Sequence, residues 1–377
     1  MSPETGLGWP LDVDVASGPL GWPALGAEGS DAAPPRDDGP PSEAEPAAAV
    51  EPAAQAEDLP MATAIREELA DASRETSLVP ERLVSRETNT SAAPDAVSRE
   101  TGATEDAPWP RPTQRRVIGV ANQKGGVGKT TSTVNLAAAL AQHGAKVLVV
   151  DLDPQGNAST AFGVEHRAGT ASIYNVLVAG RGLDEVAVPV PELPGLFCAP
   201  ATIDLAGAEI ELASMVARES RLARAVDAMA ESFDFVFVDC PPSLGLLTVN
   251  ALVAAQEVMI PIQCEFYALE GLSQLLRTLE LVRSHLNPAL HVSTILLTMY
   301  DGRTRLAEQV AQEVRTHFGE LVLGPTIPRS VRISEAPGYG QTVLTYDPSS
   351  RGARAYVEAA HELAERSALA TEATPES

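Results

Sequence analysis

Apolar runs alternate with longer amphipathic stretches from residue 114 onward. Runs that are apolar throughout are typical of strands buried on both faces, and they cover residues 117–120, 146–150, 196–199, 233–238, 258–262, 292–298 and 326–328. Helical periodicity covers residues 132–143, 246–255, 268–286, 305–318 and 352–367, and residues 206–230 form either a helix pair or one long helix. This alternation predicts an α/β fold, with a mostly parallel central sheet and helices on both faces.

The N-terminal part of the chain lacks such a pattern. Residues 1–110 carry a net charge of −16, out of −24 for the chain, and 15 of its 30 prolines. A segment of this composition cannot bury enough apolar surface to offset its chain entropy. We therefore predict a disordered acidic tail at 1–113, one α/β domain at 114–368 and a flexible C-terminus at 369–377.

Composition also bears on the cellular compartment. The three cysteines, Cys198, Cys240 and Cys264, have no metal-binding spacing, and we interpret them as small apolar residues in a reducing cytosol. No apolar run approaches the length of a membrane span, and the acidic N-terminus has no signal-peptide pattern. These features predict a cytoplasmic protein.

A glycine-rich loop joins the first predicted strand to the first predicted helix. Backbone N–H groups of such a loop, with the helix N-terminus behind them, bind phosphate oxygens. In this motif Lys129 reaches the β- and γ-phosphates, and the Thr130 hydroxyl binds Mg²⁺. The predicted nucleotide site consists of Lys124, Gly125, Gly126, Val127, Gly128, Lys129, Thr130 and Thr131.

The loop differs from the common phosphate-binding motif at its start. Gln123 stands where the first glycine is usual, and a second lysine, Lys124, follows it. The chain has 24 arginines but only three lysines, and two of these lie in this loop. A planar guanidinium cannot replace a compact ammonium there, so the composition supports phosphate binding over the alternative of a simple glycine-rich turn.

Three aspartates stand at the ends of predicted strands. Asp151 and Asp153 follow the second strand, and Asp239 ends the fourth. Carboxyl ends of parallel strands share one edge of the sheet, and a carboxylate there can hold Mg²⁺ directly or through water. Each aspartate alone could equally be a strand-end cap. Because all three converge on the loop, we predict a magnesium site.

The loop resembles the deviant Walker A motif of the SIMIBI class of P-loop ATPases. Further stretches make residues 115–366 resemble the ParA/Soj family of chromosome-partitioning ATPases, which implies a P-loop NTPase fold. These stretches are VDLDPQGN (150–157), LAGAEIEL (205–212), VDCPPSLGLLTVNAL (238–252), PIQCEFYALEGLSQLL (261–276), LLTMYDGRT (296–304) and IPRSVRISEAP (327–337).

The resemblance implies a role for each matching residue of the ATP site. Lys129 binds the phosphates, and Lys124 completes the partner's site in a nucleotide sandwich dimer, where Gly125 lies at the dimer face. Asp153 orients the attacking water, and Asp239 is the Walker B acid that helps Thr130 to hold Mg²⁺. Two further residues, Pro328 and Arg329, line the base.

The resemblance also implies DNA binding. Arg303 matches the basic residue that contacts DNA, and we add Arg332 and Arg351 as candidate contacts. Affinity for DNA depends on local phosphate contacts, so the net charge of −24 does not exclude it. Two weak basic half-patches joined by dimerisation would make binding ATP-dependent. A solvated surface arginine is the alternative at each position except Arg303.

The predicted function is therefore an ATP-dependent dimerising switch. The ATP-bound homodimer binds nucleoid double-stranded DNA non-specifically. A ParB-like partner triggers Mg²⁺-dependent ATP hydrolysis and the release of the protein from DNA, and hydrolysis without the partner is slow. The alternative is a MinD-like ATPase of the membrane surface. That function needs a basic amphipathic C-terminal helix, whereas this chain ends in an acidic segment. A third class, an electron-transfer iron protein, needs two exposed cluster cysteines per subunit.

Short repeats stand out in the predicted tail. Leu-Gly-Trp-Pro occurs at 7–10 and 20–23, and its tryptophans favour anchoring in a partner's pocket, with sequence drift as the alternative. Ser-Arg-Glu-Thr occurs at 73–76, 85–88 and 98–101, twice preceded by valine. The pentad Val-Ser-Arg-Glu-Thr can be encoded by a palindrome that resembles the centromere-like parS site bound by ParB. We interpret the repeats as translated partition sites, and a protein-level motif is the alternative.

Overall fold

The computed structural model describes residues 109–230, 232–265 and 270–372. The predicted tail up to residue 108, with both sets of repeats, and residues 373–377 lie outside the described residues. The boundaries proposed for the domains stay predictions. Trp109, which falls inside the predicted tail, stacks on His143 with 3.7 Å between ring centroids and meets His361 edge-on at 5.0 Å.

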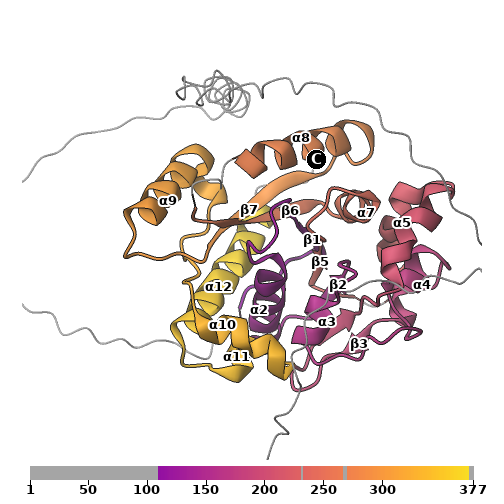
Figure 1. Cartoon of the computed structure of the whole chain (residues 1–377), viewed down its shortest axis with the longest axis horizontal. Helices are drawn as coiled ribbons and strands as arrows, with labels where there is room; N and C mark the ends of the chain where they lie inside the picture. Colours follow the sequence, from indigo (N-terminus) through magenta and orange to yellow (C-terminus); the bar gives the residue numbers. More distant parts are fainter. Residues whose placement is uncertain (1–108, 231, 266–269, 373–377) are drawn as a thin grey trace, which may run out of the picture. The chain divides into compact units, whose positions relative to one another are not determined.

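A mostly parallel sheet lies at the centre of the described chain, as predicted (Figure 1). Its strand order is β3-β4-β2-β5-β1-β6-β7, and of these neighbours only β3 and β4 run antiparallel. The strands are β1 (Arg116–Val120), β2 (Val147–Asp151), β3 (Val188–Pro189), β4 (Leu196–Ala199), β5 (Phe235–Asp239), β6 (Glu257–Gln263) and β7 (His291–Thr298).

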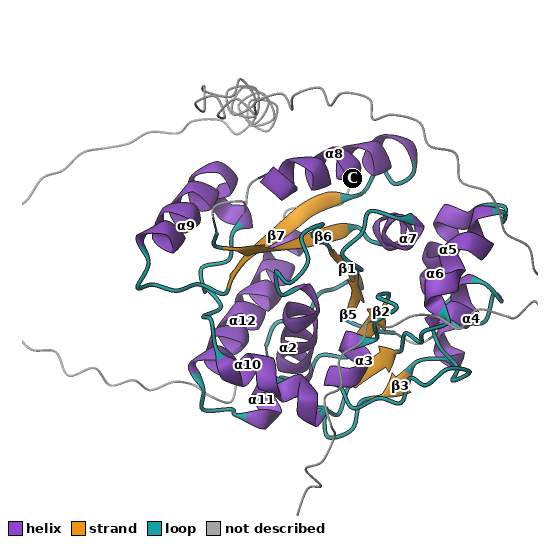
Figure 2. Cartoon of the chain, viewed as in Figure 1, coloured by secondary structure: helices purple, strands orange, loops and turns teal. Residues whose placement is uncertain are grey.

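Helices cover both faces of this sheet (Figure 2). They are α2 (Lys129–Gln142), α3 (Asn157–Ala161), α4 (Ile173–Leu177), α5 (Leu205–Ala213), α6 (Arg221–Asp227), α7 (Leu246–Ala254), α8 (Glu270–His285), α9 (Arg305–Phe318), α10 (Val331–Glu335), α11 (Val343–Tyr346) and α12 (Arg351–Glu372). Successive residues of a strand point to opposite faces. Val117 accordingly packs in the core with α4 to α9, and Ile118 packs in the core with α2 and α12. Burial on both sides explains why the strands are apolar throughout.

Two predicted elements differ from the structure, whereas residues 206–230 form the first of the two predicted alternatives. They form a helix pair, α5 and α6, separated by a turn at Ala217, whose φ is 50°. Residues 326–328 do not form the predicted strand. They run beside the end of β7, where the N–H of Ile327 donates to the carbonyl of Leu297 (2.8 Å) and Pro328 forms an isolated bridge with Tyr300. No ladder continues there, because proline has no N–H to extend it. The C-terminal helix continues beyond its predicted end at Ser367 to Glu372.

Candidate nucleotide site

The glycine-rich loop leaves β1 and ends where α2 begins at Lys129. Gly126 and Gly128 have φ of 73° and 88°, values that a residue with a Cβ rarely adopts. Neighbouring strands hold the loop: the Asn122 side chain donates to the carbonyl of Pro261 in β6 (2.8 Å), and Thr298 at the end of β7 donates to the carbonyl of Val127 (2.8 Å). The fold therefore presents the loop at the carboxyl edge of the sheet.

Lys129 is the first residue of α2, and its side chain is buried. Its Nζ lies 3.4 Å from the carbonyl oxygen of Lys124. Burial lowers the pKa of this ammonium, and the nearby carboxylate of Asp239 opposes that shift. The ammonium thus lies between the loop and the acids of the neighbouring strands, where a phosphate would complete its coordination.

The predicted magnesium residues meet beside Lys129. Asp239 is fully buried; its Oδ1 accepts from the Thr133 hydroxyl (3.2 Å), whereas Oδ2 has no hydrogen-bond partner in the described part of the chain. Burial is the main cause that raises the pKa of Asp239, the charge of Asp151 adds to it, and Thr130 and Thr133 oppose it. A buried carboxylate oxygen that lacks a hydrogen-bond partner is a suitable ligand for a hard cation. The residues present therefore fit Mg²⁺.

Asp151 has a structural connection that the sequence did not reveal. It pairs in register with Asp239, and it accepts from the backbone N–H (2.8 Å) and the hydroxyl (2.7 Å) of Ser159 in α3. It also accepts from the N–H of Asp153 (3.3 Å), whose carboxylate is buried. Asp151 thereby fixes the segment between β2 and α3, which carries Asp153. The contact between Ser159 and Asp151 depends on the tertiary fold and could not be predicted from the sequence.

Lys124 contacts a residue that the sequence analysis left without a role. Its Nζ lies 3.4 Å from one carboxylate oxygen of Glu265, and Arg329 lies 3.5 Å from the other. Glu265 therefore joins the proposed bridging lysine to the proposed base-lining arginine. The three side chains remain between one third and two thirds exposed, so these ion pairs are easily exchanged.

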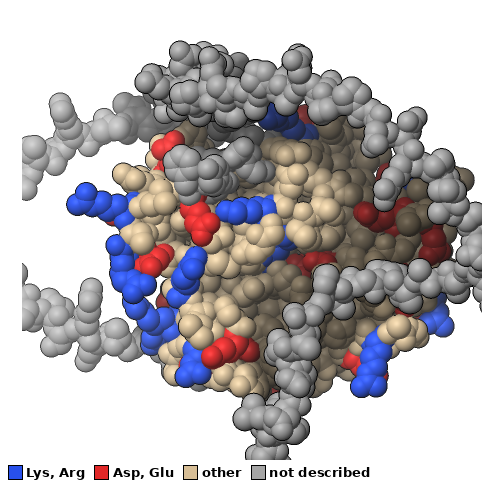
Figure 3. All heavy atoms as spheres, in the orientation of Figure 1, with Lys and Arg blue, Asp and Glu red and all other residues tan. Residues whose placement is uncertain are grey.

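The predicted base-lining residues and two of the three predicted DNA contacts, Arg303 and Arg351, share one cavity of about 630 Å³. It is lined by Tyr300, Asp301, Gly302, Arg303, Thr326, Pro328, Arg329, Arg351 and Ala355. Arg303 donates to both carboxylate oxygens of Asp301 (2.9 and 2.8 Å) and is 88% exposed. Basic side chains gather along this side of the molecule, by α9 and α10 (Figure 3).

Arg332 does not line that cavity. It lies on α10 and pairs with Glu335 (3.3 Å) and Asp347 (3.6 Å). The two nearby acids reduce the positive potential that Arg332 can offer to a DNA phosphate. The structure thus separates Arg332 from the two other predicted DNA contacts.

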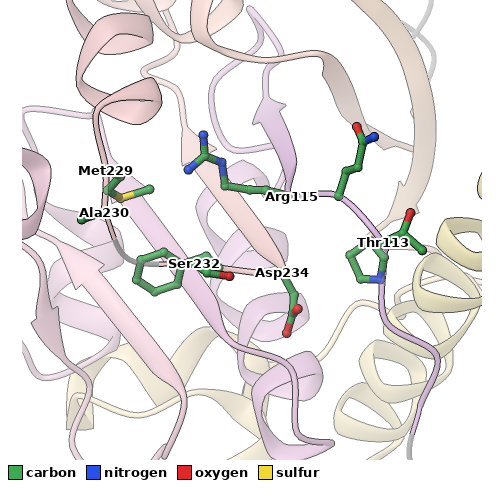
Figure 4. A pocket seen from close by; sticks show the side chains of 9 residues that line it. Thr113, Arg115, Met229, Ala230, Ser232 and Asp234 are labelled. Carbon is green, nitrogen blue, oxygen red and sulfur yellow. The ribbon is translucent and has the colours of Figure 1, made fainter.

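A second, smaller cavity of about 260 Å³ lies at the opposite edge of the sheet, where β1 and β5 begin. Thr113 and Arg115 stand on one side of it, and Met229, Ala230 and Ser232 on the other (Figure 4). None of the predicted site residues lines it.

Comparison with known proteins gives the family. Residues 115–292 match the model of an AAA domain family. The sporulation initiation inhibitor protein Soj of Bacillus subtilis is 51% identical over 249 residues, covering 66% of this chain and 98% of Soj. The chromosome partitioning protein ParA of Caulobacter vibrioides is 50% identical over 253 residues, covering 67% of this chain and 94% of ParA. The chain belongs to the ParA/Soj family of chromosome-partitioning ATPases.

A solved structure shares the fold of this chain. A structure described as cobyrinic acid a,c-diamide synthase from Mycobacterium smegmatis, with a bound ATP analogue and magnesium, is 41% identical. It matches with a TM-score of 0.57, over 66% of this chain and 94% of that protein. The resemblance found in the sequence motifs is thereby confirmed. Within the described residues, no helix of this ParA/Soj-family protein is long and apolar enough to cross a membrane.

Proposed function

We propose that this ParA/Soj-family ATPase is a dimerising switch that partitions chromosomes by binding nucleoid DNA in its ATP state. One observation carries the proposal. The glycine loop, the buried ammonium of Lys129 and the unpartnered Oδ2 of Asp239 meet at one edge of the sheet. This set of groups suits a magnesium-bound nucleoside triphosphate.

Each residue at this edge has a proposed task. Lys129 and the N–H groups of residues 124–131 would bind the phosphates. Thr130 and Asp239 would hold a Mg²⁺ ion, which would supply positive charge against the phosphate oxygens. Asp153 orients the attacking water. Asp151 keeps Asp153 in place through its hydrogen bonds to Ser159 and to the N–H of Asp153. The bound nucleotide in the Mycobacterium smegmatis structure supports this assignment.

Lys124 is the residue that would connect two copies of the chain in the proposed dimer. Its contact with Glu265 is solvent-exposed, so the ammonium can leave it and reach the nucleotide of a second copy. No atom of the described residues lies within 4 Å of the place where a Cβ of Gly125 would stand. A partner surface can therefore approach it closely. A ParB-like protein would stimulate hydrolysis and so return the dimer to monomers.

DNA binding would require the dimer, because each copy offers only a small set of arginines around the cavity of Arg303 and Arg351. Two such sets double the number of phosphate contacts, and affinity depends steeply on that number. The resulting dimer would reside on the nucleoid in the cytoplasm.

A DNA-retention assay tests this function. Wild-type protein should retain double-stranded DNA of arbitrary sequence with ATP and release it with ADP. The Lys129→Ala variant should bind no nucleotide, because no other ammonium can replace this one. The Lys124→Ala variant should bind ATP but remain monomeric in size-exclusion chromatography and retain no DNA. Equal retention with ATP and ADP would contradict the proposal.

A further inference from the structure

Helix α5 carries apolar residues on two sides. Its inner side chains Leu205, Ala208 and Leu212 are fully buried in the core. A second apolar series runs along the outside at spacings of three or four residues, which place side chains on one face of a helix. This outer stripe consists of Ile203, Ala206, Ile210, Ala213 and Val216, all of them exposed. Ile203 and Val216 lie in the turns that flank the helix.

The acidic residues of α5 do not shield this outer stripe, although Arg218 donates to the carbonyl of Ala213 near its C-terminal end. The two acidic residues of α5 are used elsewhere: Glu209 accepts from the N–H of Leu247 at the start of α7 (3.2 Å), and Glu211 accepts from the hydroxyl of Tyr174 in α4 (3.0 Å). Ile203, Ile210 and Val216 are 62%, 80% and 89% exposed. A single exposed aliphatic residue is ordinary, but a helix that is apolar on both sides is typical of one that becomes covered.

The outer stripe adjoins the nucleotide site. Helix α5 follows β4, whose carboxyl end lies at the same sheet edge as the glycine loop. The N–H of Ala201, just before α5, donates to the Ser159 hydroxyl (3.2 Å), which itself donates to Asp151. At the other side, Glu209 binds the first turn of α7, the helix that follows Asp239 and the loop after it. Both acid-bearing segments of the site are thus in contact with α5 or with the turn before it.

We propose that the outer stripe of α5 is buried against a second copy of this chain when ATP closes the dimer. This inference rests on the proposed ATP-dependent dimerisation. Because α5 follows the carboxyl end of β4, at the sheet edge that carries Lys124, the same partner copy can cover both. Large and small side chains also alternate along it, from Ile203 through Ala206 and Ile210 to Ala213, which allows close packing against another helix surface.

The outer stripe is too small to hold two copies together without bound nucleotide. A stable interface buries about 800 Å² on each partner, which is more than five aliphatic side chains supply. The stripe alone therefore leaves the protein monomeric. Added to the nucleotide contacts, it extends the interface and favours the closed dimer, since α5 is connected to the segments that carry Asp153 and Asp239.

Thiol reactivity tests whether the stripe becomes covered. The chain's three cysteines are all buried, so an Ile210→Cys variant adds the accessible thiol that a maleimide reagent would modify. We expect fast modification with ADP and at least about tenfold slower modification with a non-hydrolysable ATP analogue, because a thiol reacts only where it is exposed. The matched control is Leu281→Cys on α8, a residue that is 63% exposed, whose rate should be the same in both states.

Two further variants separate this inference from the proposed function. Lys124→Ala combined with Ile210→Cys should react equally fast with either nucleotide, because it forms no dimer. Ile210→Glu should bind nucleotide as wild type does but stay monomeric in light scattering, whereas Leu281→Glu should dimerise. Unchanged reactivity of Ile210→Cys in a demonstrated dimer would overturn the inference and leave the switch intact. Protection of the thiol in the Lys124→Ala monomer would also overturn it, since another occupant would then cover the stripe.

Discussion

Asp239 places a carboxyl group in the core, and one of its oxygens has no hydrogen-bond partner among the residues that the structure describes. Burial and the neighbouring Asp151 raise its pKa from the ordinary 3.8 to about 8. A carboxyl group whose pKa is raised on folding contributes stability that is fully present below the unfolded pKa, and this contribution is lost as the pH rises through the folded pKa. The cost of keeping this charge in the nucleotide-free protein therefore grows with pH.

The first prediction concerns the stability of Asp239→Asn. Without nucleotide and Mg²⁺, wild-type protein should lose thermal stability between about pH 5.5 and pH 8, and the variant should lose less. At the upper end the variant should be more stable by about 1–3 kcal/mol, because asparagine keeps the shape but carries no buried charge. Thermal unfolding across this range measures the difference, with the surface variant Glu308→Gln as control. Parallel pH profiles for the variant and wild type would contradict the prediction.

The second prediction concerns Glu265, which holds Lys124 in the monomer at 3.4 Å. Glu265→Gln removes this ion pair, so Lys124 no longer has to leave a partner in order to cross to a second copy. We expect the variant to dimerise at an ATP concentration up to about fivefold lower, in keeping with the small energy of an exposed pair. Titrations followed by light scattering would measure it. In a Lys124→Ala background the same change should have no effect, and weaker dimerisation of Glu265→Gln alone would contradict the idea.

At the scale of elements, the loop between β7 and α9 presents Arg303 to solvent while Asp301 binds it through both carboxylate oxygens. The pairing lowers the pKa of Asp301 to about 2, so this negative charge persists at any physiological pH. It stands beside the guanidinium that we propose to contact DNA. Asp301 therefore competes with a DNA phosphate for the guanidinium of Arg303.

The third prediction follows from this competitor. Asp301→Asn keeps an acceptor for the N–H of Arg303 but removes the charge, so DNA affinity in the ATP state should rise a few-fold. Arg303→Ala should lower the slope of log affinity against log salt by about one for each lost phosphate contact. Arg283→Ala on α8 serves as the matched control. If neither Asp301→Asn nor Arg303→Ala alters the binding curve, the loop does not touch DNA.

How far the sequence predicts each element depends on how local its cause is. Strands such as β2 and β5 can be predicted from the sequence, because all their residues are buried and their apolar runs are therefore uninterrupted. The position of the aspartate that ends each strand can be predicted together with the strand. Strand β3 was not predicted, since Val188–Pro189 is too short to show a pattern. The apolar run at 326–328 was wrongly predicted as a strand, because periodicity does not reveal that Pro328 cannot extend a ladder.

The candidate site divides in the same way. Lys129, Thr130 and Asp239 can be predicted from motifs, because their spacing along the chain reflects a strand that runs into a loop. Glu265 is 141 positions from Lys124, and nothing local indicates their contact. The link from Asp151 to Ser159 likewise requires α3 to be placed against β2. Contacts of this kind are set by tertiary packing alone.

At the scale of the whole molecule, the ATPase fold accounts for residues 115–366, but it gives no reason for the repeats at 73–76, 85–88 and 98–101. They lie outside the described residues. Two of them extend to an identical pentad, Val-Ser-Arg-Glu-Thr, and the third differs from it only at Ala72. Identity over five residues in a segment of otherwise simple composition needs a cause at the level of the protein or of the gene.

The last prediction assigns that cause to the gene. Back-translated as GTT TCA CGT GAA ACA, the pentad contains GTTTCACGTGAAAC, which is its own reverse complement and resembles the parS site of this family. A chain with 24 arginines and three lysines points to a GC-rich gene, whose ordinary codons would be GTC, TCC or CGC. If the repeats are partition sites, the rarer TCA, CGT and GAA should persist at all three repeats, and a ParB-like protein should protect them in a footprint of the gene. A protein-level motif would instead leave these codons ordinary and their DNA unprotected, while substitution of Arg86 or Glu87 would disturb segregation even with the palindrome restored elsewhere.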